Sequence, residues 1–172
     1  MIHIANERPT DIAAREALLD RVMPERFLKP SQRLRAGRLP APGLSLVARD
    51  GERLVGSVRL WQIAAGGRPA LLLGPLAADP GIQGKGVGSG LMQVALSRAA
   101  MAGHGAVILV GDPEYYERFG FTADRTSGLI MPAPVERRRF LGLDLVPHWL
   151  SKTKGMVAAA GTPIQGALAR AA

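Results

Sequence analysis

Apolar positions in the first half of the chain come in short runs, after one helical segment near the start. The Pro-Thr-Asp sequence at residues 9–11 is typical of a helix opening. The later apolar runs are separated by Asp50-Gly51 and Gly66-Gly67, and such dipeptides favour tight turns between antiparallel strands. The expected elements are a strand at 2–5, a helix over about 9–22, a short helix within 27–35, a loop at 37–43, and a meander of strands at 44–48, 54–63 and 70–78.

The second half of the chain has a different period. Apolar residues recur at helical spacing from Val87, and Gly103 is a typical helix stop, so we predict a helix over about 87–102. A compact apolar strand at 106–110 follows, and a strand–helix–strand unit should place it parallel to the strand at 70–78. The remaining expected elements are a short helix at 113–118, a loop with Pro132 and Pro134, and a last strand at 140–146.

The C-terminal stretch differs in composition from the rest. From Ser151 onward it is rich in alanine and glycine and has few large apolar residues. We therefore divide the chain into a domain at 1–150 and a tail at 151–172 that lies outside the main core. A terminal helix resting on the domain is favoured over a lid or a dimer contact, and a homodimer stays open.

Composition bounds the class of protein. At 172 residues, 47% of them apolar, the chain is long enough for one domain with a real core. It has no cysteine, which excludes disulfides, cysteine-ligated zinc, iron–sulfur clusters and an acyl-cysteine intermediate. The three histidines are scattered, so no metal site is expected. With no signal peptide at residues 1–9 and no apolar run near about 18 residues, we expect a cytoplasmic protein without a membrane span.

A net charge of +8 favours anionic partners. The arginines are scattered apart from the run Arg137-Arg138-Arg139, which is more typical of a solvated surface than of a ligand site. Nucleic acid is disfavoured as a partner because no aromatic side chains lie among these arginines to stack on bases.

A glycine-rich turn joins the strand at 70–78 to the next helix. Backbone N–H groups of such a turn, at the positive end of a helix dipole, form a site for phosphate or pyrophosphate. A P-loop is excluded, because Gly86 follows Gly84-Lys85 where Ser or Thr is required. A dinucleotide fingerprint, with Asp112 as its ribose-binding carboxylate, is disfavoured because an antiparallel meander precedes the turn.

Two motifs resemble those of the GNAT superfamily of N-acetyltransferases. Residues 80–88 match the signature Gln/Arg-x-x-Gly-x-Gly/Ala, and Tyr116 stands four residues before Gly120-Phe121, as in the second signature. The resemblance covers roughly residues 2–150, and residues 112–121 are similar to a bacterial subgroup of predicted N-acetyltransferases. It implies an α/β (α+β) fold with a mixed, mostly antiparallel sheet, a central parallel strand pair and flanking helices.

The resemblance also implies a reaction and a site. The donor would be acetyl-CoA, the acceptor an amine, and transfer would be direct, in a ternary complex. The N–H of Ala78 would stabilise the oxyanion, and Tyr116 would protonate the leaving thiolate. The implied acetyl-CoA contacts are Leu76, Ala77 and Ala78 along the strand, and Gln83, Gly84, Lys85, Gly86, Val87, Gly88 and Ser89 at the turn.

Several points stay open. Residues 71–76 carry no glutamate, so a general base is not evident, and water relayed to Asp79 or a backbone carbonyl is an alternative. Glu25, Glu52, His104 and His148 are candidates only by residue type. A CoA-binding module without catalysis is therefore the alternative function. The acceptor is a small molecule or a protein N-terminus of unknown identity. Trp149 and His148 either line its pocket or anchor the C-terminal part.

Overall fold

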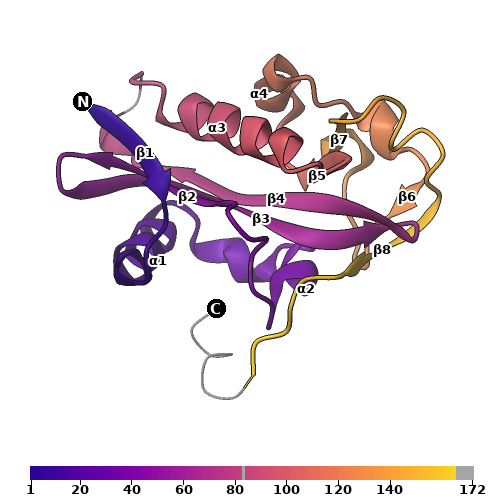
Figure 1. The fold of residues 1–172 in the computed structure, drawn as a ribbon, viewed down its shortest axis with the longest axis horizontal. Helices are drawn as coiled ribbons and strands as arrows, with labels where there is room; N and C mark the ends of the chain where they lie inside the picture. Colours follow the sequence, from indigo (N-terminus) through magenta and orange to yellow (C-terminus); the bar gives the residue numbers. More distant parts are fainter. Residues whose placement is uncertain (83, 166–172) are drawn as a thin grey trace.

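The computed structural model describes residues 1–82 and 84–165, and its centre is one eight-stranded sheet. Helices α3 and α4 cover one face of the sheet, and α1 and α2 cover the other (Figure 1). The helices are α1 (Ile12–Val22), α2 (Gln32–Arg35), α3 (Val87–Met101) and α4 (Pro113–Tyr116). The strands are β1 (Ile2–Asn6), β2 (Ser45–Asp50), β3 (Arg53–Ala65), β4 (Arg68–Ala78), β5 (Ala106–Val110), β6 (Leu129–Ile130), β7 (Phe140–Asp144) and β8 (Gly155–Ala159).

The strand order is β1-β2-β3-β4-β5-β7, and each neighbouring pair is antiparallel except β4 and β5. Strand β8 pairs with the end of β3 and with the short β6. Helix α3 is the crossover between the two parallel strands, as the apolar period predicted. The mixed, mostly antiparallel sheet with a central parallel pair is thus confirmed.

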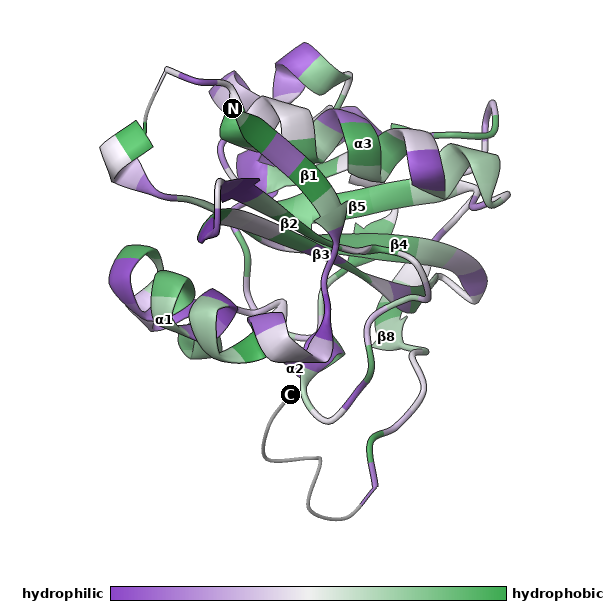
Figure 2. Ribbon diagram, turned by 60° about the vertical axis from the view of Figure 1, so that its left-hand side comes forward, coloured by the Kyte–Doolittle hydropathy of each residue, from purple (hydrophilic) through white to green (hydrophobic). Residues whose placement is uncertain are grey.

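The core lies on both sides of the sheet. Nearly every residue of β3 is buried, as expected for a strand that helices cover on both faces. Leu91 and Met92 of α3 pack against one face, and Leu18 and Leu19 of α1 pack against the other. Figure 2 shows hydrophobic residues running along β4 and β5 between these helical layers.

Strands β4 and β5 diverge toward their carboxyl ends. Their register is confined to the pairs Leu71–Val107 and Leu72–Ile108 in the described part of the sheet. On its other edge β4 stays paired with β3, although a bulge leaves residues 74 and 75 opposite a single β3 residue. The sheet is therefore open where both strands end, a common location for ligands in sheets with parallel strands.

Two expectations about the C-terminal part are wrong. The strand at 140–146 is not the last, because residues 155–159 form β8. The stretch after Ser151 is not outside the core either, because Val157 is 2% exposed and β8 pairs with residues 63–65. Small residues suit this place, since a Cβ at Gly66 would lie 2.5 Å from the carbonyl oxygen of Lys154. Part of the predicted tail, residues 166–172, lies outside the described residues.

The short helix expected within 27–35 is divided. A 3-10 turn at Pro24–Leu28 precedes α2, and Pro30 between them lacks the N–H that a continuous helix needs. Of the helices in the described part of the chain, none has the length and apolar character that crossing a bilayer requires.

Candidate functional site

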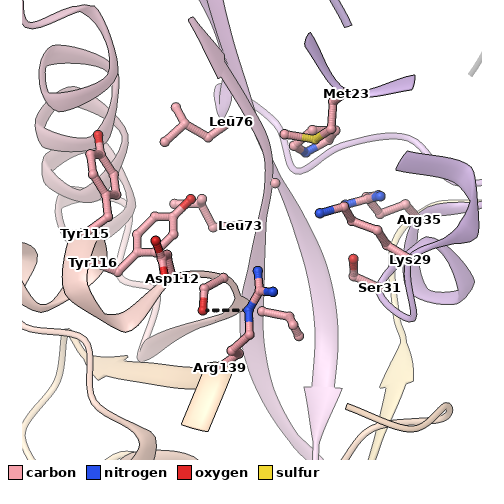
Figure 3. Close-up of a pocket in the computed structure, with 14 residues that line it drawn as sticks. Met23, Lys29, Ser31, Arg35, Leu73, Leu76, Asp112, Tyr115, Tyr116 and Arg139 are labelled. Carbon is pink, nitrogen blue, oxygen red and sulfur yellow. Dashed lines mark hydrogen bonds between the residues drawn. The ribbon is translucent and has the colours of Figure 1, made fainter. Parts of the chain in front are cut away.

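A cavity of about 360 Å³ lies where β4 and β5 diverge. Tyr116 and Asp112 line one side of it, and Lys29 and Arg35 line the opposite side (Figure 3). The bulged segment of β4, with Leu76, lies between these two sides. The cavity is of the size that binds small molecules.

The backbone of β4 turns polar groups toward this gap at alternate residues. The N–H of Asp79 donates to the carbonyl of Val55 in β3 at 2.8 Å. Because N–H groups alternate in direction along a strand, those of Leu76 and Ala78 point away from β3. Ala77 instead directs its backbone to β3 and buries its side chain on the α1 face. Ala78 can thus donate to a developing oxyanion, and Leu76 and Ala78 can pair with an extended ligand.

A second cavity, of about 420 Å³, lies at the N-terminus of α3, and Tyr115 lines both cavities. Gly84 and Gly86 have φ values of 84° and 71°, and a Cβ at either would meet nothing within 4 Å. Open backbone amides at the positive end of α3 suit a pyrophosphate. The predicted residues that line this cavity are Ala78, Gly84, Gly86, Val87, Gly88 and Ser89.

Two further residues of this second cavity were missed in the sequence. A Cβ at Gly88 would lie 2.8 Å from the Tyr115 hydroxyl oxygen, so this hydroxyl lies at the start of α3. Arg118 lies over the Tyr115 ring at 4.6 Å and adds a positive charge to the cavity. The signal was the spacing of three between Tyr115 and Arg118 in one helical turn. Of the predicted residues, Lys85 is exposed and does not line the cavity, and Gln83 lies outside the described residues.

Asp79 organises the turn that leads into this cavity. Its Oδ1 accepts a hydrogen bond from the N–H of Gly81 at 2.9 Å, and its Oδ2 pairs with Arg21 and Arg53. The Gly81 hydrogen bond, and then these two arginines, hold the pKa of the Asp79 carboxyl below its ordinary value. Such a carboxylate is a poor proton acceptor. The two arginines also offset its charge beside an anion site.

Tyr116 lies at the end of α4 beside the divergence of the strands. Its ring packs edge-on against Tyr115, with centroids 4.9 Å apart, and against Phe121, at 6.0 Å. Burial, and then the neighbouring Tyr115 and Asp112, raise the pKa of Tyr116 to about 12. Its hydroxyl points toward β4 in Figure 3. A tyrosine with this pKa keeps its proton at neutral pH, so its hydroxyl is present as a donor to negative charge that develops beside it.

Among the described residues, Asp112 is the acidic side chain that lines the first cavity. Asp112 is exposed, and hydrogen bonding with Glu114, followed by partial desolvation, raises its pKa above the ordinary value. Glu114 in turn pairs with Arg138. In the sequence, Asp112 was considered only as a ribose ligand of a different fold. The sequence signal for a role in this cavity was its position just after β5 and four residues before Tyr116.

The residues named only by type do not line the first cavity. Glu25 and Glu52 are exposed. His104 lies just after the C-terminus of α3 and His148 just after that of β7, and neither lines the cavity. Trp149 anchors the chain, because its Nε1 donates to the carbonyl of Pro69 at 2.8 Å and Arg68 lies 3.9 Å above its ring. The anchoring interpretation of Trp149 is therefore the one that the structure supports.

Comparison with known proteins gives the family. The model for the acetyltransferase (GNAT) domain matches residues 41–123. A crystal structure of the GNAT family N-acetyltransferase YhbS from Escherichia coli in complex with CoA is 29% identical, with a TM-score of 0.78, over 92% of this chain and 89% of that one. A GNAT family acetyltransferase from Brucella melitensis in complex with acetyl-CoA is 30% identical, with a TM-score of 0.68, over 93% and 96% of the two chains.

Curated relatives match over shorter segments. The uncharacterized N-acetyltransferase YjhQ of Escherichia coli strain K12 is 32% identical over 104 residues, which are 56% of this chain and 58% of that protein. The chain thus spans little more than half the length of this relative. Together with the structural matches, which cover about nine-tenths of the chains, these findings establish that the chain belongs to the GNAT acetyltransferase family.

Proposed function

We propose that this chain is an acetyl-CoA-dependent N-acetyltransferase that acts on a primary amine by direct transfer in a ternary complex. The observation that carries the proposal is the combination of three features around one opening of the sheet. These are the outward-facing N–H of Ala78, the glycine-lined start of α3, and the Tyr116 hydroxyl, which keeps its proton at neutral pH. The complexes of YhbS with CoA and of the Brucella protein with acetyl-CoA add support.

Acetyl-CoA would be held at two places. Its pyrophosphate fits the amides around Gly84 and Gly86, with Arg118 and Tyr115 beside them. Its pantetheine arm can pair with Leu76 and Ala78, which leads the thioester into the gap between β4 and β5. When bound, acetyl-CoA supplies the acetyl group as an activated thioester.

Three residues of the chain have separate roles in the acetyl transfer. A neutral amine forms a bond to the acetyl carbon while the N–H of Ala78 stabilises the negative charge on the carbonyl oxygen. The carbon–sulfur bond breaks, and the Tyr116 hydroxyl gives its proton to the departing sulfur. The amine nitrogen must lose one proton, and Asp112, which lines the same cavity, accepts it directly or through water. The raised pKa of Asp112 suits a proton acceptor better than the lowered pKa of Asp79.

The test is amine-dependent release of CoA. The protein is incubated with acetyl-CoA and a panel of primary amines, free thiol is followed with time, and mass spectrometry identifies the acetylated product. Steady turnover with one acetylated amine per CoA released is expected. Binding of CoA without turnover on any amine would favour the alternative, a CoA-binding module without catalysis.

A further inference from the structure

The buried arginines differ in whether a carboxylate pairs with them, and this difference bears on the identity of the acceptor. Four arginines in the described part of the chain are at least nine-tenths buried: Arg15, Arg26, Arg35 and Arg59. Three of them hold carboxylates: Arg15 and Arg59 pair with Glu7, and Arg26 pairs with Glu16 and Asp20. No carboxylate of the described residues pairs with Arg35, which is 7% exposed. A buried charge without a partner is costly, so such a group points to an anion that binds from outside.

Arg35 is aimed at the first cavity. Within the described residues it donates two hydrogen bonds, both from Nη2: to the carbonyl of Arg26 at 3.5 Å and to Oε1 of Gln32 at 3.3 Å. Nη1 faces the β4 bulge, 3.5 Å from where a Cβ on Gly74 would lie. Figure 3 shows the guanidinium of Arg35 directed from α2 toward β4. Burial, and then repulsion from Arg26, lower the pKa of Arg35 to about 10, so it remains charged at neutral pH.

Two other cations line the cavity, and Lys29 is the one that reinforces the charge of Arg35. Lys29 lies beside Arg35, and Arg139 lies at the end of the cavity, where its Nε donates to the carbonyl of Gly111 at 3.4 Å. Neither pairs with a carboxylate of the described residues. The carboxylate that lines the cavity, Asp112, lies on the opposite side with Tyr116. The cavity therefore has one side suited to an amine and another suited to an anion.

We propose that the acceptor is a small amine that also carries a carboxylate or phosphate group, which Arg35 binds with Lys29 beside it. This inference rests on the proposed function, since the amine must reach the thioester near Ala78 and Tyr116. Arg35 is then a specificity-determining residue. Removing it leaves no carboxylate of the described residues without a partner, so the fold should tolerate Arg35→Met better than loss of a paired buried arginine.

The experiment compares amines that differ only in the anionic group. The pairs are β-alanine and its amide, γ-aminobutyrate and its amide, and phosphoethanolamine and ethanolamine, each at an equal concentration of free amine. The wild type should favour the anionic member in kcat/KM by about 10- to 100-fold, the range for a hydrogen bond to a charged group. Arg35→Met and Lys29→Met should reduce this preference. The pair with the larger preference tells carboxylate from phosphate.

Arg33→Met is the matched control, because Arg33 lies on α2 but is exposed and donates to the carbonyl of Pro132 outside the cavity. It should keep the wild-type preference. Equal or better use of the neutral amines by the wild type, or a preference that survives in Arg35→Met, would overturn the inference while the proposed function stands.

Binding provides a readout that needs no turnover. With CoA present, each anionic amine should raise the melting temperature of the wild type more than its neutral partner does, and this difference should shrink in Arg35→Met. That pattern without turnover would support binding of the anionic group by Arg35 but would overturn its role in choosing an acceptor, together with the proposed function. Equal shifts for both members of every pair would overturn the inference.

Discussion

A Cβ at Gly111 would lie 2.5 Å from Cε2 of the Tyr116 ring, so the ring occupies space that only glycine leaves free. Gly111 follows β5 directly, and this contact therefore couples the end of that strand to the position of the Tyr116 hydroxyl. We expect Gly111→Ala to displace the ring and to lower kcat by about 10-fold or more, because proton transfer requires close alignment. Steady-state kinetics on the folded variant measures this effect.

A double variant separates displacement of the ring from general damage. If Gly111→Ala acts through Tyr116, it should cost little further activity in a Tyr116→Phe background, because coupled residues are not additive. Full additivity of the two losses would show that Gly111 acts by another route.

Gly86→Val should abolish most of the affinity for acetyl-CoA while the fold survives. Gly86 has a left-handed φ of 71°, which strains a valine, and a Cβ there would meet nothing within 4 Å, so the new side chain extends into the phosphate site. Isothermal titration calorimetry measures the affinity. Gly67→Val is the matched control: φ there is 83°, no atom lies within 4 Å of a Cβ, and the β3–β4 turn is outside the site. Equal affinities in both variants would refute the assignment of the pyrophosphate to the turn around Gly84 and Gly86.

Asp79→Asn should destabilise the protein in a pH-dependent way. The folded-state pKa of Asp79 is lowered from 3.8, first by the Gly81 hydrogen bond and then by Arg53 and Arg21. A lowered pKa stabilises the folded state above the ordinary pKa, and this stabilisation is lost as pH falls through the folded value. The difference in melting temperature between wild type and variant should therefore be full at pH values above 3.8 and shrink at lower pH. A difference that stays constant into strong acid would contradict this role of the charge.

Val157→Ala tests the place of β8 in the core. Val157 is 2% exposed, so its truncation should lower the free energy of unfolding by about 2 kcal/mol through lost burial and a small cavity. Met156 on the same strand is 52% exposed, and Met156→Ala should cost less than about 0.5 kcal/mol. Urea denaturation compares the two. Similar small losses would mean that β8 adds little to the core.

Most elements of residues 1–146 could be predicted because they carry a local signal, but the two-residue β6 and the division of the helix within 27–35 could not. Turn dipeptides such as Asp50-Gly51 mark the hairpins, and the helical period from Val87 marks α3. Strand β8 has no such signal. Its residues 157–159 are held by pairing with residues 63–65, a contact between segments about ninety residues apart that composition does not reveal.

The residues of the site likewise fall into those with a local sequence signal and those fixed by long-range packing. The turn glycines and Tyr116 belong to motifs within short segments, and the structure puts Gly84, Gly86 and Gly88 together in one cavity. Arg35 could not be found in the sequence, because it looks like any other arginine of a basic chain. Its significance comes from its burial beside β4 with no carboxylate of residues 1–82 and 84–165 paired to it, and this depends on where α2 packs.

The central claim is that an acetyl group is transferred to an amine at the gap between β4 and β5, with Tyr116 as the proton donor. The most direct measurement is the amine-dependent initial rate of CoA release by the wild type and by Tyr116→Phe, together with their affinities for acetyl-CoA. The account predicts that kcat falls by about 10²-fold or more in Tyr116→Phe while the affinity hardly changes, because the ring remains and only the proton is lost. Wild-type turnover in Tyr116→Phe would contradict it.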